Sequence, residues 1–381
     1  MRGNEALRPL AAQLLSKNQH LLTRNVRPSL SAEDLRAAEL ELSLVYGEYV
    51  TQRVGGFTEI QEASEMGVLA TAQSYSNVIR YLGGLPGNGG VLLIDVGSST
   101  TTLCASIDHQ AYVDIRNDLG LGHSAVTAMN AISGENIRRW LSSEISDNDL
   151  QDYAWNKVAR PSSAPQTGGD LEIEYAMARE LIRLITKDSR ARWKIPENQP
   201  LPPMRQIIGA GSLLAQAINP GIGALLILDA LQPTGIVRLQ LDPYGVIPAL
   251  GGIAYIAPKA TVQVLENGGL LDVGTAICPT GRPPSGAAIT ATITYANGRS
   301  EKHVIAGGQI KTVGLPVGQK AQVTMKMGRG MRLNGRANLT MQLEGGAAGI
   351  IFDGRGRPFY PPKKTEDRKA ALQGWYAGVR G

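Results

Sequence analysis

The sequence is poor in the residues that build metal centres, disulfide frameworks and membrane spans. Its 381 residues include two cysteines and four histidines, and neither set has the spacing of metal ligands. Cys104 and Cys278 lie far apart in apolar surroundings, so we expect two buried free thiols in a reducing compartment. No run of about 18 apolar residues occurs, and polar residues interrupt residues 1–19 too often for a secretory signal. These absences predict a cytoplasmic protein without a structural metal or a membrane span.

Aromatic residues are also scarce, at 5% of the sequence. The hydrophobic fraction of 43% and the charged fraction of 19% are ordinary for a globular protein. The core must therefore consist mainly of leucine, isoleucine, valine and alanine. The 45 glycines indicate many turns, and 381 residues are enough for two or three domains.

The net charge of +5 is unevenly distributed along the chain. Residues Lys320–Gly381 hold 12 lysines and arginines against 4 acids, so the remainder is slightly acidic. A basic segment of this kind attracts nucleic acids or acidic protein surfaces. A solvated surface is the favoured interpretation, because no RNA- or DNA-binding motif accompanies the charge.

Residues 1–88 have helical patterns. Acids follow Ser31, which is typical of a helix start, and predict a helix over residues 31–54. Its apolar stripe recurs at three- and four-residue steps: Leu35, Ala38, Leu42, Val45 and Tyr49. A second helix is expected over residues 62–82, and the run GGLPGNGG at residues 83–90 then marks a boundary.

Residues 89–258 have an α/β pattern. Three short strands joined by connections of hairpin length are predicted over residues 91–96, 101–106 and 111–116. A helix over residues 124–141 follows, then a loop, a second helix and a short strand that leads into a helix start at Ser212. This order of three strands and a helix resembles the start of each half of the actin/Hsp70/sugar-kinase fold.

From about residue 259 to residue 362 the pattern changes to short alternating strands with glycine turns. Such a pattern predicts a small β-barrel or β-sandwich domain. Residues 363–381 form a basic tail in which a short terminal helix is expected.

The stretch VLLIDVGSSTTTLCAS, residues 91–106, carries the main candidate site. Six of its residues are candidates: Asp95, Gly97, Ser98, Ser99, Thr100 and Thr101. Backbone N–H groups of a tight turn can hold a phosphate where bulky side chains stay away, and the glycine and the two serines meet this requirement. The threonine hydroxyls add donors, and the acid at the strand end is suited to hold a hydrated Mg²⁺ through water. An Asp-x-Gly strand end is also an ordinary way to turn a hairpin, so both interpretations stay open.

A second glycine turn occurs in IIGAGSLLAQA, where a predicted strand passes through Gly209 and Gly211 into a helix. Such a turn makes room for a flat group or a phosphate near the helix N-terminus. Close packing of the strand against the helix explains the two glycines equally well.

The two turns together have the layout of the second half of an actin-like ATPase. In that layout a Gly-Ser-Thr hairpin touches the terminal phosphates, and a strand–Gly-x-Gly–helix about 110 residues later faces the adenosine. Five blocks make the resemblance specific: LLIDVGSSTTTLCA, VDIRNDLGLGHSA, IIGAGSLLAQAINPGIGALLILDALQPTGIVRLQLD, VIPALGGIA and GIIFDGRGRPFYPP. The chain resembles the glutamate mutase L family, accessory proteins encoded beside cobalamin-dependent mutases, over about Val91–Pro362.

The resemblance implies a ribonuclease-H-like half of an actin/Hsp70-type ATPase. It also implies binding of ATP and Mg, with Asp95 as the residue that holds the metal through water. By analogy with reactivating factors of cobalamin enzymes, it implies a chaperone-like role on a mutase as the protein partner. Self-association is compatible with this role.

Two departures from the superfamily pattern favour a different class of function. Superfamily members normally carry two phosphate hairpins, one in each half, and only one is found here. The chain therefore looks like the C-terminal part of a longer protein, or like a protein that has lost one of the two hairpins. Ser98 and Ser99 also replace glycines, and Thr102 stands where a further acid is expected. The alternative is a non-catalytic scaffold or assembly protein that keeps the fold without a working ATP site. Nucleic-acid binding through the basic tail ranks last.

Other polar residues have a structural and a functional interpretation. Asn117, Asp118 and His123 follow the third strand and are expected near the nucleotide cleft, although a structural turn is favoured for His123. Asp229 in an apolar run needs a partner, and capping of the turn at residues 232–235 is favoured over catalysis. Arg355 and Arg357 are candidates for an anion or partner contact, with a tight β-turn as the alternative.

Overall fold

The computed structural model describes residues 5–18, 25–27, 38, 42, 45, 49, 53, 55–64, 68–87, 89–254 and 256–380. The chain divides into two compact units, Met1–Gln73 and Ser74–Gly381. No helix among the described residues has the length and apolar character needed to cross a membrane.

The first unit contains the short 3₁₀ turn η1 (Glu5–Leu7) and the helices α1 (Arg8–Leu14) and α3 (Phe57–Ala63). The helix predicted over residues 31–54 lies largely outside the described residues. Four positions of its apolar stripe are described, and all four are helical: Ala38, Leu42, Val45 and Tyr49. The helix predicted over residues 62–82 is found as α4 (Thr71–Gly84), which begins nine residues later than expected.

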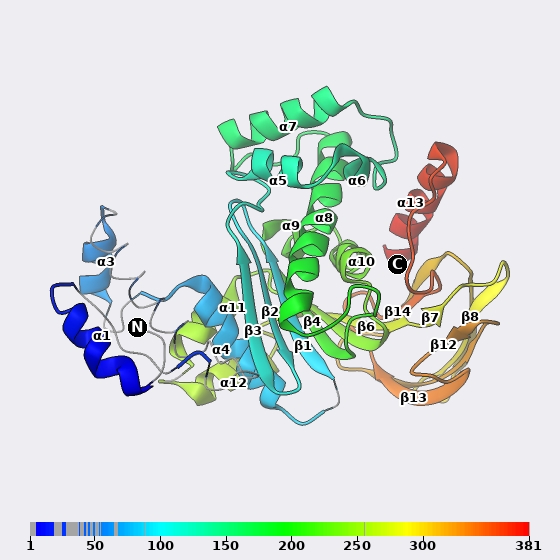
Figure 1. Ribbon diagram of the computed structural model, residues 1–381. Coiled ribbons are helices and arrows are strands. Elements are labelled where there is room, and N and C mark those ends of the chain that lie inside the picture. Colours follow the sequence, from blue (N-terminus) through cyan, green and yellow to red (C-terminus); the bar gives the residue numbers. More distant parts are fainter. Residues whose placement is uncertain are drawn as a thin grey trace. The chain divides into compact units, whose positions relative to one another are not determined.

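The second unit is a mixed α/β structure around an eight-stranded sheet (Figure 1). The strand order is β10-β14-β6-β5-β4-β1-β2-β3. The strands of this sheet are β1 (Gly90–Val96), β2 (Thr101–Ile107), β3 (Gln110–Arg116), β4 (Met204–Ala210), β5 (Gly235–Leu241), β6 (Leu271–Cys278), β10 (Ile310–Val313) and β14 (Ile350–Asp353). β1 pairs with β2 antiparallel and with β4 parallel, and β4 pairs with β5 parallel.

Helices cover both faces of the central strands because β1 is apolar on both sides. Leu92, Ile94 and Val96 pack into a core with residues of α8 and α10. Val91 and Leu93 pack into another core with residues of α4 and α11. The helices are α5 (Ala125–Ala131), α6 (Gly134–Arg138), α7 (Asp147–Ala159), α8 (Gly168–Arg192), α9 (Ser212–Ala215), α10 (Pro220–Leu231), α11 (Val246–Ile253), α12 (Pro258–Glu266) and α13 (Thr365–Val379).

Two helices begin at capping boxes that can be read in the sequence. The Ser146 hydroxyl accepts from the N–H of Asp149 at the start of α7, and Thr167 and Asp170 make the same arrangement at α8. The helix predicted over residues 124–141 is broken into α5 and α6. The break occurs because Ser133 adopts an extended conformation and caps α6 by accepting from the N–H of Asn136.

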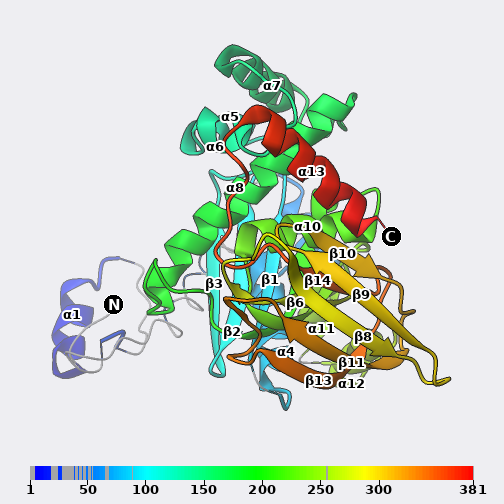
Figure 2. The ribbon, with the colours of Figure 1, turned by 90° about the vertical axis from the view of Figure 1, so that its right-hand side faces the viewer.

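The β-rich segment, predicted as a barrel or a sandwich, forms open sheets, and a closed barrel is not found among its described strands (Figure 2). A four-stranded sheet has the order β13-β11-β8-β9, and β12 pairs with β7 in a two-stranded sheet. The strands are β7 (Thr280–Gly281), β8 (Ala287–Thr294), β9 (Ser300–Ala306), β11 (Lys320–Met327), β12 (Met331–Arg332) and β13 (Asn338–Glu344). β6, β10 and β14 instead extend the large sheet, and their residues Ile277, Val313 and Phe352 share a core with the four-stranded sheet. The four-stranded sheet is therefore a second layer on the end of the eight-stranded sheet that β6, β10 and β14 form.

Candidate functional site

The carboxyl ends of β1 and β4 bring the two predicted turns together. Asp95 near the end of β1 pairs with Ala210 near the end of β4, and Gly211 follows directly. A Cβ atom at Gly211 would lie 2.4 Å from the carbonyl oxygen of Val96 and 2.7 Å from Oδ1 of Asp95. Gly211 also has φ +84°, so the close approach and the backbone conformation both require glycine.

The turn between β1 and β2 presents backbone donors to solvent. The N–H of Gly97 donates to the carbonyl oxygen of Thr100 at 2.9 Å and closes the hairpin. The next three N–H groups, of Ser98, Ser99 and Thr100, donate to no acceptor within the described residues. Ser98 and Ser99 are exposed. Successive free N–H groups in a turn form a concave site that favours an anion.

A loop fixes this turn from the other side. The N–H groups of Leu121 and Gly122 donate to the carbonyl oxygens of Gly97 and Ser98, at 3.0 and 2.8 Å. The Ser124 hydroxyl donates to the carbonyl oxygen of Ser99 at 2.8 Å. The carbonyl groups of the turn are thus satisfied within the protein, and its N–H groups are left for another partner.

The close contact between this loop and the Gly97–Thr100 turn explains the glycines of the block DLGLGHS. A Cβ at Gly120 would lie 2.4 Å from the carbonyl oxygen of Ser98, and one at Gly122 would lie 2.1 Å from Oγ of Ser98. Both distances are shorter than a carbon atom tolerates. The loop can therefore reach the turn only with glycine at position 120, and a side chain at position 122 would displace the Ser98 hydroxyl.

The polar side chains of the turn and the loop are mostly bound to each other. Oγ of Ser98 lies 3.0 Å from Nδ1 of His123 and accepts from the His123 N–H at 3.2 Å. His123 therefore holds the turn, as its structural interpretation predicts. The Thr101 hydroxyl is buried and donates to the carbonyl oxygen of Leu119 at 2.8 Å, so the fold already occupies this expected phosphate donor.

Asn117 and Asp118 also have structural contacts. The carbonyl oxygen of Asn117 accepts from the Ser124 hydroxyl at 3.1 Å. Asp118 forms a two-pronged pair with Arg116 at 2.7 and 2.8 Å. The hydrogen bond from Arg116 lowers the pKa of Asp118 below its ordinary value. Asp118 is thus an ionised partner of Arg116 beside the loop.

Asp95 is held by residues that the sequence pattern did not identify. The Tyr75 hydroxyl of α4 donates to Oδ2 of Asp95 at 3.1 Å. Burial raises the pKa of the Asp95 carboxyl, the Tyr75 hydrogen bond opposes this rise, and the negative charge of Asp242 adds to it. Burial and the neighbouring Asp95 in turn raise the pKa of Tyr75 well above its ordinary value. The site therefore holds a carboxylate whose charge is poorly compensated by the protein.

Asp242 at the end of β5 is the other acid at this edge. Its carboxylate accepts from the N–H groups of Val246 and Ile247, at 2.8 and 3.0 Å, and so satisfies the start of α11. The sequence contained a signal for this residue, because LQLD ends a strand in an acid as LLID does. Tyr75 had no such signal, because its helix precedes the sheet in the sequence.

Gly209 has a packing role. A Cβ there would lie 2.8 Å from Cδ1 of Ile227 on α10 and 2.8 Å from Cδ2 of Leu241 on β5. This contact matches the close strand–helix packing that was the alternative interpretation of Gly209. Of the two glycines of this turn, Gly211 is the one that lies beside Asp95.

The sequence segments LLILDALQPTG and FDGRGRPF meet in a buried charge network. Asp229 is fully buried and accepts from Nε of Arg179 at 2.7 Å and from Nη1 of Arg355 at 2.5 Å. Asp353 accepts from Arg355 and Arg357, each at 2.7 Å. The partner that Asp229 needs is thus a pair of arginines.

The turn after α10 is held by Gln232 and not by Asp229. The Gln232 side chain exchanges two hydrogen bonds with the backbone of Phe359.

The network holds three arginines against two aspartates, and aromatic faces compensate part of the surplus charge. The Arg179 guanidinium lies 4.9 Å from the ring centroid of Trp140, and that of Arg355 lies 4.2 Å from Phe359 and 4.8 Å from Trp375. Burial alone would raise the pKa of Asp353, but Arg355 and Arg357 hold it well below its ordinary value. Arg355 and Arg357 are buried in this network, so they are not exposed anion or partner contacts.

Solved structures with some likeness to the chain include actin homologs. Component A of (R)-2-hydroxyglutaryl-CoA dehydratase from Acidaminococcus fermentans is 11% identical, over 50% of this chain and 68% of that chain, with a TM-score of 0.27. The archaeal actin homolog Ta0583 is 16% identical, over 51% of this chain and 55% of that chain, with a TM-score of 0.27. Its complex with ADP is matched over 65% of this chain and 76% of that chain, with 16% identity and a TM-score of 0.26. At these TM-scores the likeness carries no conclusion about this chain.

The family comparison is more extensive than these structural matches. No curated protein sequence matches the chain. A sequence model of the family described as MutL protein, however, matches residues 1–268, which is well over half of the chain. The match includes the turn at Gly97–Thr100, Asp95, Gly211 and the Asp229 block. The chain therefore belongs to the MutL protein family, the glutamate mutase L family that its sequence blocks resemble.

Proposed function

We propose that this chain binds a Mg²⁺-nucleotide, ATP or ADP, at the Gly97–Thr100 turn. The observation that carries the proposal is the row of three free N–H groups at Ser98, Ser99 and Thr100. Phosphate oxygens are the ligands that such a row favours. The carbonyl oxygens of the turn accept hydrogen bonds from the loop. The turn therefore offers N–H donors to a phosphate and few carbonyl oxygens that would repel it.

Asp95 and Gly211 support the proposal from the neighbouring strands. No group of three or more metal-ligating side chains occurs among the described residues. Mg²⁺ suits such a sparse donor set, since it keeps several waters and takes one or two carboxylates. In the proposal Asp95 accepts hydrogen bonds from the waters of the ion, and the absent side chain of Gly211 leaves room beside it. The bound ion would neutralise phosphate charge.

The strand order supports a ribonuclease-H-like half of an actin-type ATPase. Strands β3-β2-β1-β4-β5 place two antiparallel hairpin strands on one side of β1 and two parallel strands on the other. Ligands of open α/β sheets bind beyond the carboxyl ends of such strands, where Asp95 and Gly211 lie. We propose residues 89–258 as this nucleotide-binding half.

Membership of the family supports an accessory, chaperone-like role on a cobalamin-dependent mutase, with the mutase as the protein partner. Nucleotide binding would then control the association with the mutase. In cells, Asp95→Ala should abolish this assistance while the protein still accumulates in folded form.

Hydrogen–deuterium exchange tests the nucleotide site directly. Mg·ATP should slow the exchange of the amides of Ser98, Ser99 and Thr100, because they would donate to phosphate oxygens. The turn between β2 and β3 at Asp108 and His109 lies at the other end of these strands and should exchange unchanged. Unchanged exchange at all five residues under saturating Mg·ATP would overturn the proposal.

A non-catalytic scaffold is the second candidate, and one observation favours it. Ser98 stands in place of a glycine, and its hydroxyl binds His123 of the fixing loop. A turn held in this way would persist without any nucleotide. A scaffold should keep its cellular function in Asp95→Ala, which distinguishes it from a nucleotide-dependent factor.

A further inference from the structure

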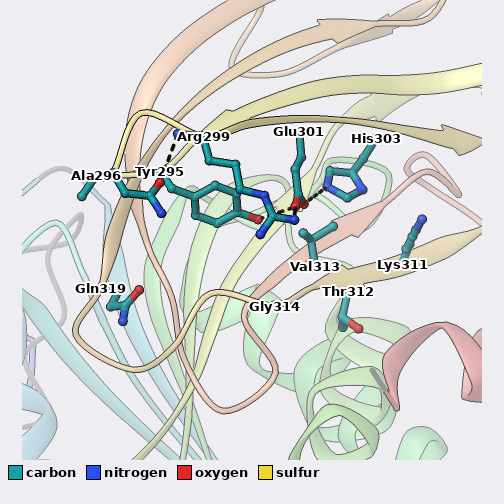
Figure 3. A pocket seen from close by; sticks show the side chains of 11 residues that line it. Tyr295, Ala296, Arg299, Glu301, His303, Lys311, Thr312, Val313, Gly314 and Gln319 are labelled. Carbon is teal, nitrogen blue, oxygen red and sulfur yellow. Dashed lines mark hydrogen bonds and ion pairs between the residues drawn. The ribbon is translucent and has the colours of Figure 1, made fainter.

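A pocket of about 720 Å³ lies far along the sequence from the nucleotide site, at the edge of the two packed sheets (Figure 3). β9 is the edge strand of the four-stranded sheet, and β10 is the edge strand of the eight-stranded sheet. Residues from both strands line it, together with the turn at residues 295–299 and Gln319. The pocket volume is in the range of small-molecule sites.

Charged side chains of this pocket lie on the same strand faces as core residues, because side chains alternate between the two faces of a strand. Glu301 and His303 alternate with Lys302 on β9 and share the face of Ile305, which is buried in the core between the sheets. Lys311 on β10 likewise shares the face of Val313, another core residue. The inner faces of the two sheets therefore continue beyond the apolar core as a polar, charged lining.

The one acid in this lining is already satisfied by its neighbours. Glu301 forms an ion pair with Arg299 and accepts from the Tyr295 hydroxyl at 3.2 Å. Nε2 of His303 lies 3.3 Å from the same carboxylate, without making a hydrogen bond to any described residue. Figure 3 shows Tyr295, Arg299, Glu301 and His303 in a row that faces Val313 and Lys311 across the pocket.

The groups left over are donors and cations. Lys311 has no ion-pair partner among the residues that the structure describes. Arg299 and Lys311 together exceed Glu301 by one positive charge, and Gln319 adds an amide to the lining. We propose that this pocket binds a small organic oxyanion, a carboxylate or a phosphate, with its charged group against Lys311 and its body over Val313.

The alternative explanation is protection of the sheet edges. Inward-pointing charges on edge strands prevent edge-to-edge pairing with other chains, and they need no ligand. Under that explanation the loss of Lys311 should promote self-association, and added oxyanions should have no effect. The two explanations therefore predict different results for the same variant.

The histidines of the full chain provide the test, because the sequence has only four of them and each contributes a single Hε1 ring signal. The ring signal of His303 is assigned with His303→Gln, and the chain is titrated with inorganic phosphate or succinate at constant pH and ionic strength. Saturable movement of the His303 signal is expected. Lys311→Ala should weaken the apparent affinity at least about tenfold, whereas Lys302→Ala, on the opposite face of β9, should not. Comparison of phosphate with succinate identifies the preferred oxyanion.

The signal of His123 separates this proposal from the proposed nucleotide site. His123 contacts Ser98 of the Gly97–Thr100 turn, so a phosphate bound there moves His123 rather than His303. A His303 signal that is unmoved by both anions, or moved equally in Lys311→Ala, would overturn the pocket proposal. Self-association of Lys311→Ala without anion effects would assign the charges to edge protection instead.

Discussion

At the scale of single residues, Asp95 lies where the protein disfavours its charge. It is half-buried, accepts a hydrogen bond from Tyr75 and lies close enough to Asp242 for the second acid to raise its pKa. A carboxylate placed this way costs stability in the free protein. Such a cost is typical of residues retained for a ligand.

Asp95→Asn should therefore raise the free energy of unfolding at pH 7 by about 1 kcal/mol. The amide keeps an acceptor for Tyr75 and removes the disfavoured charge. Because the native pKa is raised, the gain should shrink as the pH falls through that native value and vanish below the ordinary aspartate value. Urea unfolding at several pH values measures this difference. A less stable variant at pH 7 would show that the fold depends on the charge.

In the buried arginine network, removal of a carboxylate charge is expected to destabilise the protein rather than stabilise it. Asp229→Asn should lower the free energy of unfolding by about 3 kcal/mol or more, because Arg179 and Arg355 would stay buried without their carboxylate. The surface pair Arg138–Asp147 is the matched control, since Asp147→Asn should cost less than about 1 kcal/mol. Urea unfolding of both variants measures the contrast. Equal losses would mean that the Asp229 pairs contribute no more than a surface contact.

Sequence reasoning identified many of these residues without their partners. Asp229 was expected to need a partner, yet Arg355 lies 126 positions further along the chain, and spacing gives no signal for such a contact. Arg355 and Arg357 were candidates for an anion or partner contact or for a tight β-turn, and spacing likewise gave no signal for their buried pairs with Asp353. Asp95, Gly97 and Gly211 could be identified because each lies at the end of an apolar strand or directly after it. Tyr75 could not, because its contribution depends on how α4 packs on the sheet.

At the scale of elements, apolar periodicity predicted where the strands lie in the sequence. It did not predict which sheet each strand joins. β1, β2 and β3 begin and end within one residue of their predicted bounds, because apolar runs and turn residues mark both ends. The alternating pattern after residue 259 also predicted strands. It could not indicate that β6, β10 and β14 join the large sheet, since pairing partners depend on tertiary packing.

The terminal helix α13 is expected to stabilise the end of the large sheet. Nε1 of Trp375 donates to the carbonyl oxygen of Gly308 at 2.8 Å, and the ring lies over Arg355 of the network. Trp375→Ala should lower the free energy of unfolding by about 4 kcal/mol, because it leaves a cavity and uncovers the guanidinium. Trp155→Ala on α7 is the control, as that side chain is 60% exposed and should cost little. Denaturant unfolding distinguishes the two, and similar losses would contradict this role of α13.

At the scale of the whole molecule, the sheet and its two flanking helix layers lie in one unit, Ser74–Gly381. α4 begins at Thr71, so a fragment from residue 69 keeps this helix intact. Residues 69–381 should fold alone and unfold within about 2 °C of the second unit in the full chain, because they hold a complete core. Calorimetric scanning of both proteins checks this. An unfolded fragment would show that the first unit is needed for stability.

Isothermal titration calorimetry with Mg·ATP is the direct test of nucleotide binding by the whole chain. The 381-residue protein should bind at one saturable site. Asp95→Ala should weaken this binding at least about tenfold, while Asp108→Asn, in the turn at the far end of β2, should leave it unchanged. Absence of binding by the unmodified chain, or equal binding by Asp95→Ala, would contradict a nucleotide site at the Gly97–Thr100 turn.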